Sequence, residues 1–113
     1  MSIRNFCSQT RGAEAAYQMP FTNNTVRTFD RSTIQSLNLN QNGVYGIFND
    51  REWLYVGRGD IRTRMLAHLN GDVPGLVQAR PTHWVAELVF GDGASREKQL
   101  ILELQPRFNQ RVG

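Results

Sequence analysis

Residues 43–57 have the sequence GVYGIFNDREWLYVG, in which two apolar runs flank a short polar turn. The runs, 43–48 and 53–56, are rich in β-branched and aromatic residues. This composition around a polar turn is typical of two antiparallel strands joined as a β-hairpin. We therefore expect an antiparallel sheet that begins at this hairpin.

The chain beyond the hairpin predicts two helices and one more strand. Asp60 favours the start of a helix that runs to about Leu69, where Asn70 and Gly71 favour its end. A third strand is expected over 83–90, and a second helix over 94–104, before the helix-breaking Pro106. The order ββαβα predicts an α+β domain with a small three-stranded antiparallel sheet flanked by helices.

Residues 1–40 differ from the rest of the chain. They are rich in Asn, Gln, Ser and Thr and show no sustained apolar period. We interpret them as an irregular N-terminal arm with a short helical turn near 33–39, and residues 41–113 as the folded domain. No run approaches the roughly 20 apolar residues of a membrane span, and no secretory signal is evident. The single Cys7 excludes an internal disulfide and favours a reducing, cytoplasmic setting.

The basic residues are almost all arginine. The net charge is +3, and Lys98 is the only lysine among 13 basic residues. Arginine matches phosphate oxygens two at a time, whereas lysine offers a point charge. This bias favours a partner with a phosphate backbone. A GC-rich genome would produce the same bias, and composition alone does not separate the two.

The first predicted helix places two functional side chains beside its apolar stripe. Ile61, Met65 and Leu69 form that stripe at helical spacing. Arg64 and His68 are four residues apart, so they stack on one side of the helix next to the stripe. They are either members of a site or an edge arginine and a structural histidine at the sheet.

The second predicted helix carries an unusually placed carboxylate. Leu100, Ile101 and Leu104 define its buried face, and Glu97 lies three and four residues before the first two. Its carboxylate is therefore expected to point along the apolar face, which is costly unless it is paired or holds a cation. Glu97 is either a ligand or the partner of Arg64 or another arginine.

The hairpin contributes two tyrosines. Side chains alternate along a strand, so Tyr45 and Tyr55 share a face of the sheet only if they oppose each other in register. That arrangement requires an odd number of loop residues or a β-bulge. Paired tyrosines are also common as ordinary sheet aromatics.

These features together resemble a known nuclease family. The segments GVY at 43–45, YVG at 55–57, DIRTRMLAH at 60–68 and QPRFN at 105–109, with Glu97 between the last two, are similar to the GIY-YIG nuclease signature. The likeness covers residues 43–110 and is greatest to the nuclease subunit of bacterial nucleotide-excision repair. Homing endonucleases share the signature.

The resemblance implies a reaction and roles for residues. Such nucleases hydrolyse phosphodiester bonds with one divalent metal, Mg²⁺ or Mn²⁺, whose sole protein ligand here would be Glu97. Tyr45 and Tyr55 would be the signature tyrosines, one of which places or deprotonates the attacking water. Arg64 would hold the scissile phosphate, and His68 would assist proton movement.

Two more positions are implied to serve the site. Asn109 would be the closing asparagine that buttresses it, and Arg58 would contact phosphate or tune a tyrosine. Free tyrosine has a pKa near 10, so nearby cations, including Arg58 and Arg64, are expected to lower the pKa of the tyrosine base. The segment between Tyr55 and Arg64 is shorter than the commonest family spacing.

The sequence leaves three functional hypotheses. The first is an active endonuclease on DNA, consistent with repair, mobile-element or defence functions. The second is a nucleic-acid-binding module that cuts little or not at all, and the third is an RNA-directed nuclease. A homodimer or a targeting partner protein would explain how so small a domain selects its target.

Overall fold

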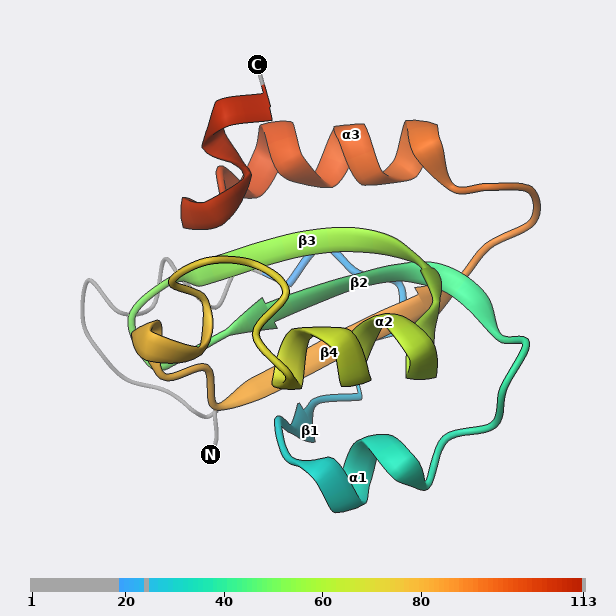
Figure 1. Cartoon of the computed structure of the whole chain (residues 1–113). Coiled ribbons are helices and arrows are strands. Elements are labelled where there is room, and N and C mark those ends of the chain that lie inside the picture. The colour runs from blue at the N-terminus through green and yellow to red at the C-terminus, as the bar shows by residue number, and fades with distance from the viewer. Residues whose placement is uncertain (1–18, 24, 113) are drawn as a thin grey trace.

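The computed structural model describes residues 19–23 and 25–112, and side chains as far as Asn109. Within these residues the protein is an α+β domain with a four-stranded antiparallel sheet and three α-helices (Figure 1). Its elements are β1 (Arg27–Thr28), α1 (Arg31–Gln35), β2 (Asn42–Phe48), β3 (Trp53–Asp60), α2 (Ile61–Leu69), β4 (His83–Leu88) and α3 (Ala94–Leu104). Two 3₁₀ helices, Val77–Ala79 and Arg107–Val112, complete the set.

The sheet has one strand more than the sequence predicts. Its spatial order is β1-β4-β2-β3, and β1 joins it because Arg27 pairs with Trp84 and Thr28 with His83. The predicted three-stranded sheet therefore lacks one strand. The predicted order ββαβα corresponds to β2, β3, α2, β4 and α3, and it does not include β1 and α1, which precede them. No sequence pattern indicates β1, since two residues are too few to show an alternation.

The hairpin turn between β2 and β3 is held by one side chain. The Asn49 Oδ1 accepts hydrogen bonds from the backbone N of Arg51 at 2.8 Å and of Glu52 at 3.0 Å. The strand register is irregular next to this turn, between Ile47 and Phe48. Such a β-bulge changes which side chains share a face beyond it.

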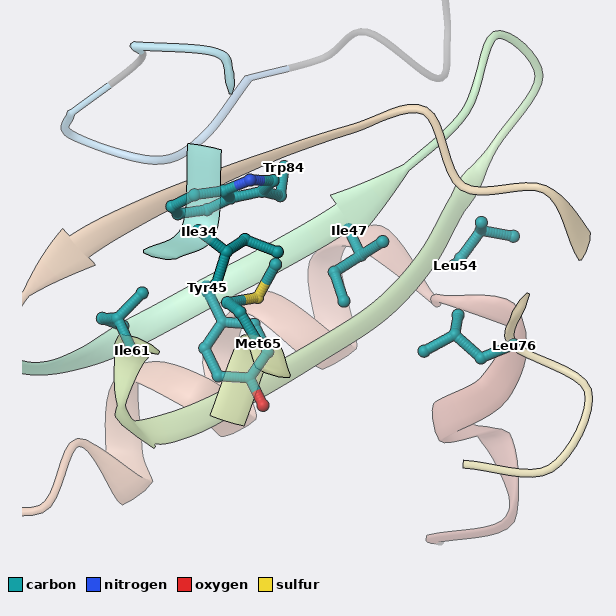
Figure 2. Packing of buried hydrophobic residues seen from close by; sticks show 8 residues of the cluster. All are labelled: Ile34, Tyr45, Ile47, Leu54, Ile61, Met65, Leu76 and Trp84. Carbon is teal, nitrogen blue, oxygen red and sulfur yellow. The ribbon is translucent and has the colours of Figure 1, made fainter. Parts of the chain in front are cut away.

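The sheet separates two apolar clusters. In Figure 1, α3 lies on one side of the sheet and α2 with α1 on the other. The α2-side cluster, shown in Figure 2, consists of Ile34, Tyr45, Ile47, Leu54, Ile61, Met65, Leu76 and Trp84. The α3-side cluster consists of Phe21, Val44, Phe48, Trp53, Val56, Val85 and Leu100.

The N-terminal segment contributes to both clusters. Phe21 is buried on the α3 side and Ile34, from α1, on the α2 side. The expected helical turn near 33–39 is present as α1, which begins after Asp30, whose side chain accepts from the backbone N of Thr33. Residues 1–18 and Cys7 among them lie outside the described residues.

Both long helices have the predicted bounds. The Asp60 side chain caps α2 by accepting from the backbone N of Thr63 at 3.1 Å. Gly71 follows the helix with φ of 86°, a conformation that suits glycine. In the described part of the chain, no helix is long and apolar enough to cross a membrane.

Candidate active site

The two tyrosines lie on the same face of the hairpin, diagonally across from each other. Tyr45 pairs with Gly57, and Tyr55 pairs with Ile47, so the tyrosines are offset by one step of two residues. Their ring centroids are 6.5 Å apart. The expectation that they share a face only in direct opposition is wrong, because diagonal neighbours on one face also meet. The bulge after Ile47 keeps Tyr55 on that face.

Two glycines of β3 make room for the site. A Cβ atom on Gly57 would collide with the Tyr45 hydroxyl and lie 2.9 Å from Cε2 of Tyr55. Gly59 has φ of 131°, and a Cβ atom there would lie 3.0 Å from Cγ of Arg64. Both positions therefore let side chains from β2 and α2 lie against the β3 backbone.

On the same face, the buried side chain of His68 connects β2 to the end of α2. The Nε2 atom of His68 lies 2.6 Å from the Tyr45 hydroxyl, and its Nδ1 atom lies 2.8 Å from Oδ1 of Asp72. His68 and Tyr45 are both fully buried. Burial lowers the pKa of His68, although the Asp72 carboxylate opposes that change. The histidine is therefore neutral at neutral pH.

Arg64 reaches the same place from the previous turn of α2. Its Nη2 atom donates to Oδ2 of Asp72 at 3.0 Å, and its side chain is 36% exposed. Its guanidinium lowers the pKa of Tyr45, because a nearby positive charge favours the phenolate. The same charge acts on Tyr55. Arg64 is thus the cation shared by both tyrosines.

The tyrosine pKa values nevertheless move upward. Burial raises the pKa of Tyr45 well above its ordinary range and outweighs the effect of Arg64. Burial also raises the pKa of Tyr55, with a further contribution from the negative charge of Glu97. Arg64 lowers the pKa of both tyrosines, as expected, but desolvation of the phenolate outweighs this effect and the net shift is upward.

Glu97 lies across the edge strand from the tyrosines. It comes from α3, its side chain is 24% exposed, and its Oε1 accepts from Nε of Arg58 at 3.0 Å. Glu97 therefore forms an ion pair, with Arg58 rather than Arg64. Because its side chain is not fully buried, it is also accessible to a metal ion, which was the other expectation. The negative charge of Glu97 also helps to raise the pKa of Tyr55.

Asn109 acts on the backbone of β3. Its Oδ1 accepts from the backbone N of Val56 at 2.8 Å, and its Nδ2 donates to the backbone O of Val56 at 3.0 Å. The asparagine is buried and completes the hydrogen bonding of β3, the last strand of the sheet order. It therefore fixes the strand between Tyr55 and Gly57 without contacting the other site residues through these bonds.

The structure thus gathers Tyr45, Tyr55, Arg64 and His68 on the α2 face, with Glu97 and Arg58 paired across β3. Asp72, which contacts both Arg64 and His68, was missed from the sequence. Its spacing of four residues from His68 is a helical signal, but Gly71 separates it from the helix. Among the described residues, no group of three or more His, Cys, Asp or Glu is placed to hold a metal ion.

Comparison of the chain with protein-family models, with curated proteins and with solved structures finds no match.

Proposed function

We propose that this protein is a metal-dependent endonuclease with a GIY-YIG-type fold and site, which hydrolyses phosphodiester bonds of nucleic acid in the cytoplasm. DNA is the proposed polymer, because repair and homing nucleases that share the signature act on it. The proposal rests on one observation, which is the convergence of Tyr45 from β2, Tyr55 from β3 and His68 from α2 on one face of the sheet, with Arg64 on the same helix.

The convergence supplies what phosphodiester hydrolysis requires. A phosphate needs a fixed cation for its developing charge, and Arg64 is a half-exposed guanidinium held by Asp72. The attacking water needs a polar group that positions it and takes its proton. Tyr55 is the better candidate for that contact, because it is partly exposed whereas Tyr45 is fully buried.

Tyr45 and His68 then act behind Tyr55. The ring centroids of Tyr55 and His68 are 4.9 Å apart in an edge-on arrangement, and Tyr45 packs against the same imidazole. These contacts fix the orientation of the Tyr55 ring. A fixed ring keeps the Tyr55 hydroxyl in one position relative to Arg64. Such fixed geometry speeds a reaction because the reacting groups need not be ordered first.

Glu97 fits a magnesium or manganese ion. Mg²⁺ keeps most of its water and binds proteins through one or two carboxylates together with substrate phosphates. A single, partly exposed carboxylate matches that chemistry. When bound, the ion would supply Lewis-acid stabilisation of the phosphate. Arg58, which holds Oε1 of Glu97, would shift toward a phosphate oxygen.

A second candidate function is nucleic-acid binding without cleavage. The ion pair of Arg58 with Glu97 favours it, because that pairing occupies a carboxylate oxygen a metal would use. The upward pKa of both tyrosines favours it as well, since a phenol with a raised pKa is a poor base.

Cleavage of supercoiled plasmid, single-stranded DNA and RNA with Mg²⁺ or Mn²⁺ tests the proposal. Glu97→Gln keeps the shape of the side chain and removes its charge, so cleavage should be lost while binding is retained. Glu103→Gln, the same change at an exposed residue of α3, should cleave like the unmodified protein. Binding should weaken steeply as salt is raised, because phosphate contacts release counterions.

Three results decide between the candidates. Metal-dependent cleavage that is lost only in Glu97→Gln supports the nuclease. Salt-sensitive binding with no cleavage of any polymer supports the binding module. Cleavage that persists in Glu97→Gln removes Glu97 as the metal ligand.

A further inference from the structure

Asp72 is held by the turn that ends α2. Its backbone N donates to the backbone O of Ala67 at 3.2 Å, just after Gly71, which has φ of 86°. This turn brings the chain back along the helix it has just left. The Asp72 carboxylate consequently lies beside two side chains of α2, Arg64 and His68.

The two oxygens of this carboxylate have separate partners. Oδ1 lies 2.8 Å from Nδ1 of His68, and Oδ2 accepts from Nη2 of Arg64 at 3.0 Å. His68 also hydrogen-bonds to the Tyr45 hydroxyl, which lies 2.6 Å from its Nε2 atom. Asp72 therefore links Arg64 to His68, and His68 continues the chain of hydrogen bonds to Tyr45.

The chemistry of these groups determines where their protons lie. A guanidinium only donates and a carboxylate only accepts, so Asp72 accepts from both of its neighbours. The His68 proton is therefore on Nδ1. The Tyr45 hydroxyl has one proton to give, and a neutral His68 receives it at Nε2.

The groups that face His68 come from every element packed around it. They are Tyr45 from β2, Tyr55 from β3, Arg64 from its own helix and Asp72 from the following turn. Asp72 is the only carboxylate among these four. Arg64 disfavours a protonated imidazole and Asp72 favours one, so the charge of Asp72 offsets that of Arg64.

We propose that Asp72 is a positioning residue of the site, which keeps the His68 proton on Nδ1 and holds the Arg64 guanidinium in place. Without the carboxylate, an amide at this position can donate to Nδ1 and move the proton to Nε2. The Nε2 proton would then face the Tyr45 hydroxyl proton, and the hydrogen bond between His68 and Tyr45 would be disrupted. The effect on cleavage rests on the proposed nuclease function, whereas the tautomer of His68 does not.

Nuclear magnetic resonance of the ¹⁵N-labelled full chain tests the tautomer directly. The protein has two histidines, so a His83→Gln background leaves His68 as the single imidazole. In that background we expect a pyrrole-type Nδ1 and a pyridine-type Nε2 at neutral pH. Asp72→Asn should reduce or reverse this pattern, and Asp50→Asn, the same change at an exposed residue of the hairpin turn, should leave it unchanged.

The opposite spectra would overturn the proposal. A proton on Nε2 in the His83→Gln protein, or an unchanged pattern in Asp72→Asn, means that Asp72 does not fix the tautomer. Asp72→Asn should not prevent folding, because Asp72 is exposed and its replacement buries no unpaired amide.

Cleavage kinetics provide the second measurement. Asp72→Asn should lower kcat about 10- to 100-fold, as loss of a residue that orients a site residue does. KM should stay unchanged, because Arg64 keeps its charge. Equal kcat in Asp72→Asn and Asp50→Asn would overturn the catalytic part. If none of the proteins cleaves, the nuclease proposal fails, and the spectra still decide the role of Asp72.

Discussion

The Tyr45 hydroxyl and the Nε2 atom of His68 lie 2.6 Å apart in a part of the core from which water is excluded. Tyr55, on the same face, is only partly buried. Two tyrosines of one motif therefore have different surroundings. The buried one is hydrogen-bonded to His68, and the other is open to a substrate.

This difference predicts opposite effects of removing the two hydroxyls. Tyr45→Phe leaves Nε2 of His68 buried without its donor, which should lower the free energy of unfolding by about 1–3 kcal/mol. Tyr55→Phe should cost less than about 1 kcal/mol but slow cleavage about 100-fold or more, as loss of a general base does. Urea unfolding and plasmid cleavage measure the two effects. If Tyr45→Phe slowed cleavage strongly and Tyr55→Phe did not, Tyr45 would be the base.

Replacement of Arg64 should act on catalysis more than on folding. Arg64→Ala removes the cation proposed to stabilise the phosphate, and cleavage should slow about 10²- to 10³-fold. Arg51→Ala, at an exposed residue of the hairpin turn, loses the same charge away from the site and serves as control. A decrease of less than about tenfold for Arg64→Ala would exclude the phosphate-holding role.

Acidic pH should destabilise the protein through its histidines. Burial lowers the pKa of His68 and of His83 below the ordinary value of 6.5. The unfolded chain therefore binds more protons than the folded protein once the pH falls below about 6.5. Stability should be complete above that pH and decline as the pH falls through it toward the folded pKa.

Urea unfolding of the His83→Gln protein at about pH 7.5 and 5.5 isolates the share of His68. Carboxylates with lowered pKa, such as Glu87, lose their contribution only at more acidic pH, below the ordinary value of 4.5. A free energy of unfolding that is the same at both values would mean that His68 does not titrate differently in the folded state.

Two glycines of the hairpin allow a matched test of the site face. Gly57→Ala places a methyl group against Tyr45 and Tyr55, and Gly46→Ala places one 2.7 Å from Trp53 on the other face. Each change should cost about 1–3 kcal/mol, the usual cost of overpacking. Only Gly57→Ala should also impair cleavage, measured below the unfolding temperature of both variants. Equal cleavage activity of the two variants would mean that the face carrying Tyr45 and Tyr55 does not take part in catalysis.

The elements predicted correctly from the sequence are those whose ends are marked by capping or helix-breaking residues. Asp60 and Gly71 bound α2, and Pro106 follows α3, because caps and helix breakers act on the adjacent backbone. The pairing of Arg27–Thr28 with β4 had no such signal, since it depends on contacts distant in the sequence.

The same distinction applies to the candidate site. Arg64 and His68 were found because both lie on one helix beside its apolar stripe. The ion pair between Arg58 and Glu97 was not predicted, because it depends on how α3 crosses β3. Asp72 was missed because a turn, rather than helical spacing, returns it to the helix.

The β-bulge beside Ile47 and Phe48 gives β3 one residue more than β2. Ile47 pairs with Tyr55 and Phe48 with Trp53, so Leu54 is the extra residue. Two successive side chains, Leu54 and Tyr55, therefore face the α2-side cluster, while Trp53 and Val56 on either side of them face the other cluster. The hairpin thus anchors the strand on the α2 side with a buried leucine directly beside the partly exposed tyrosine.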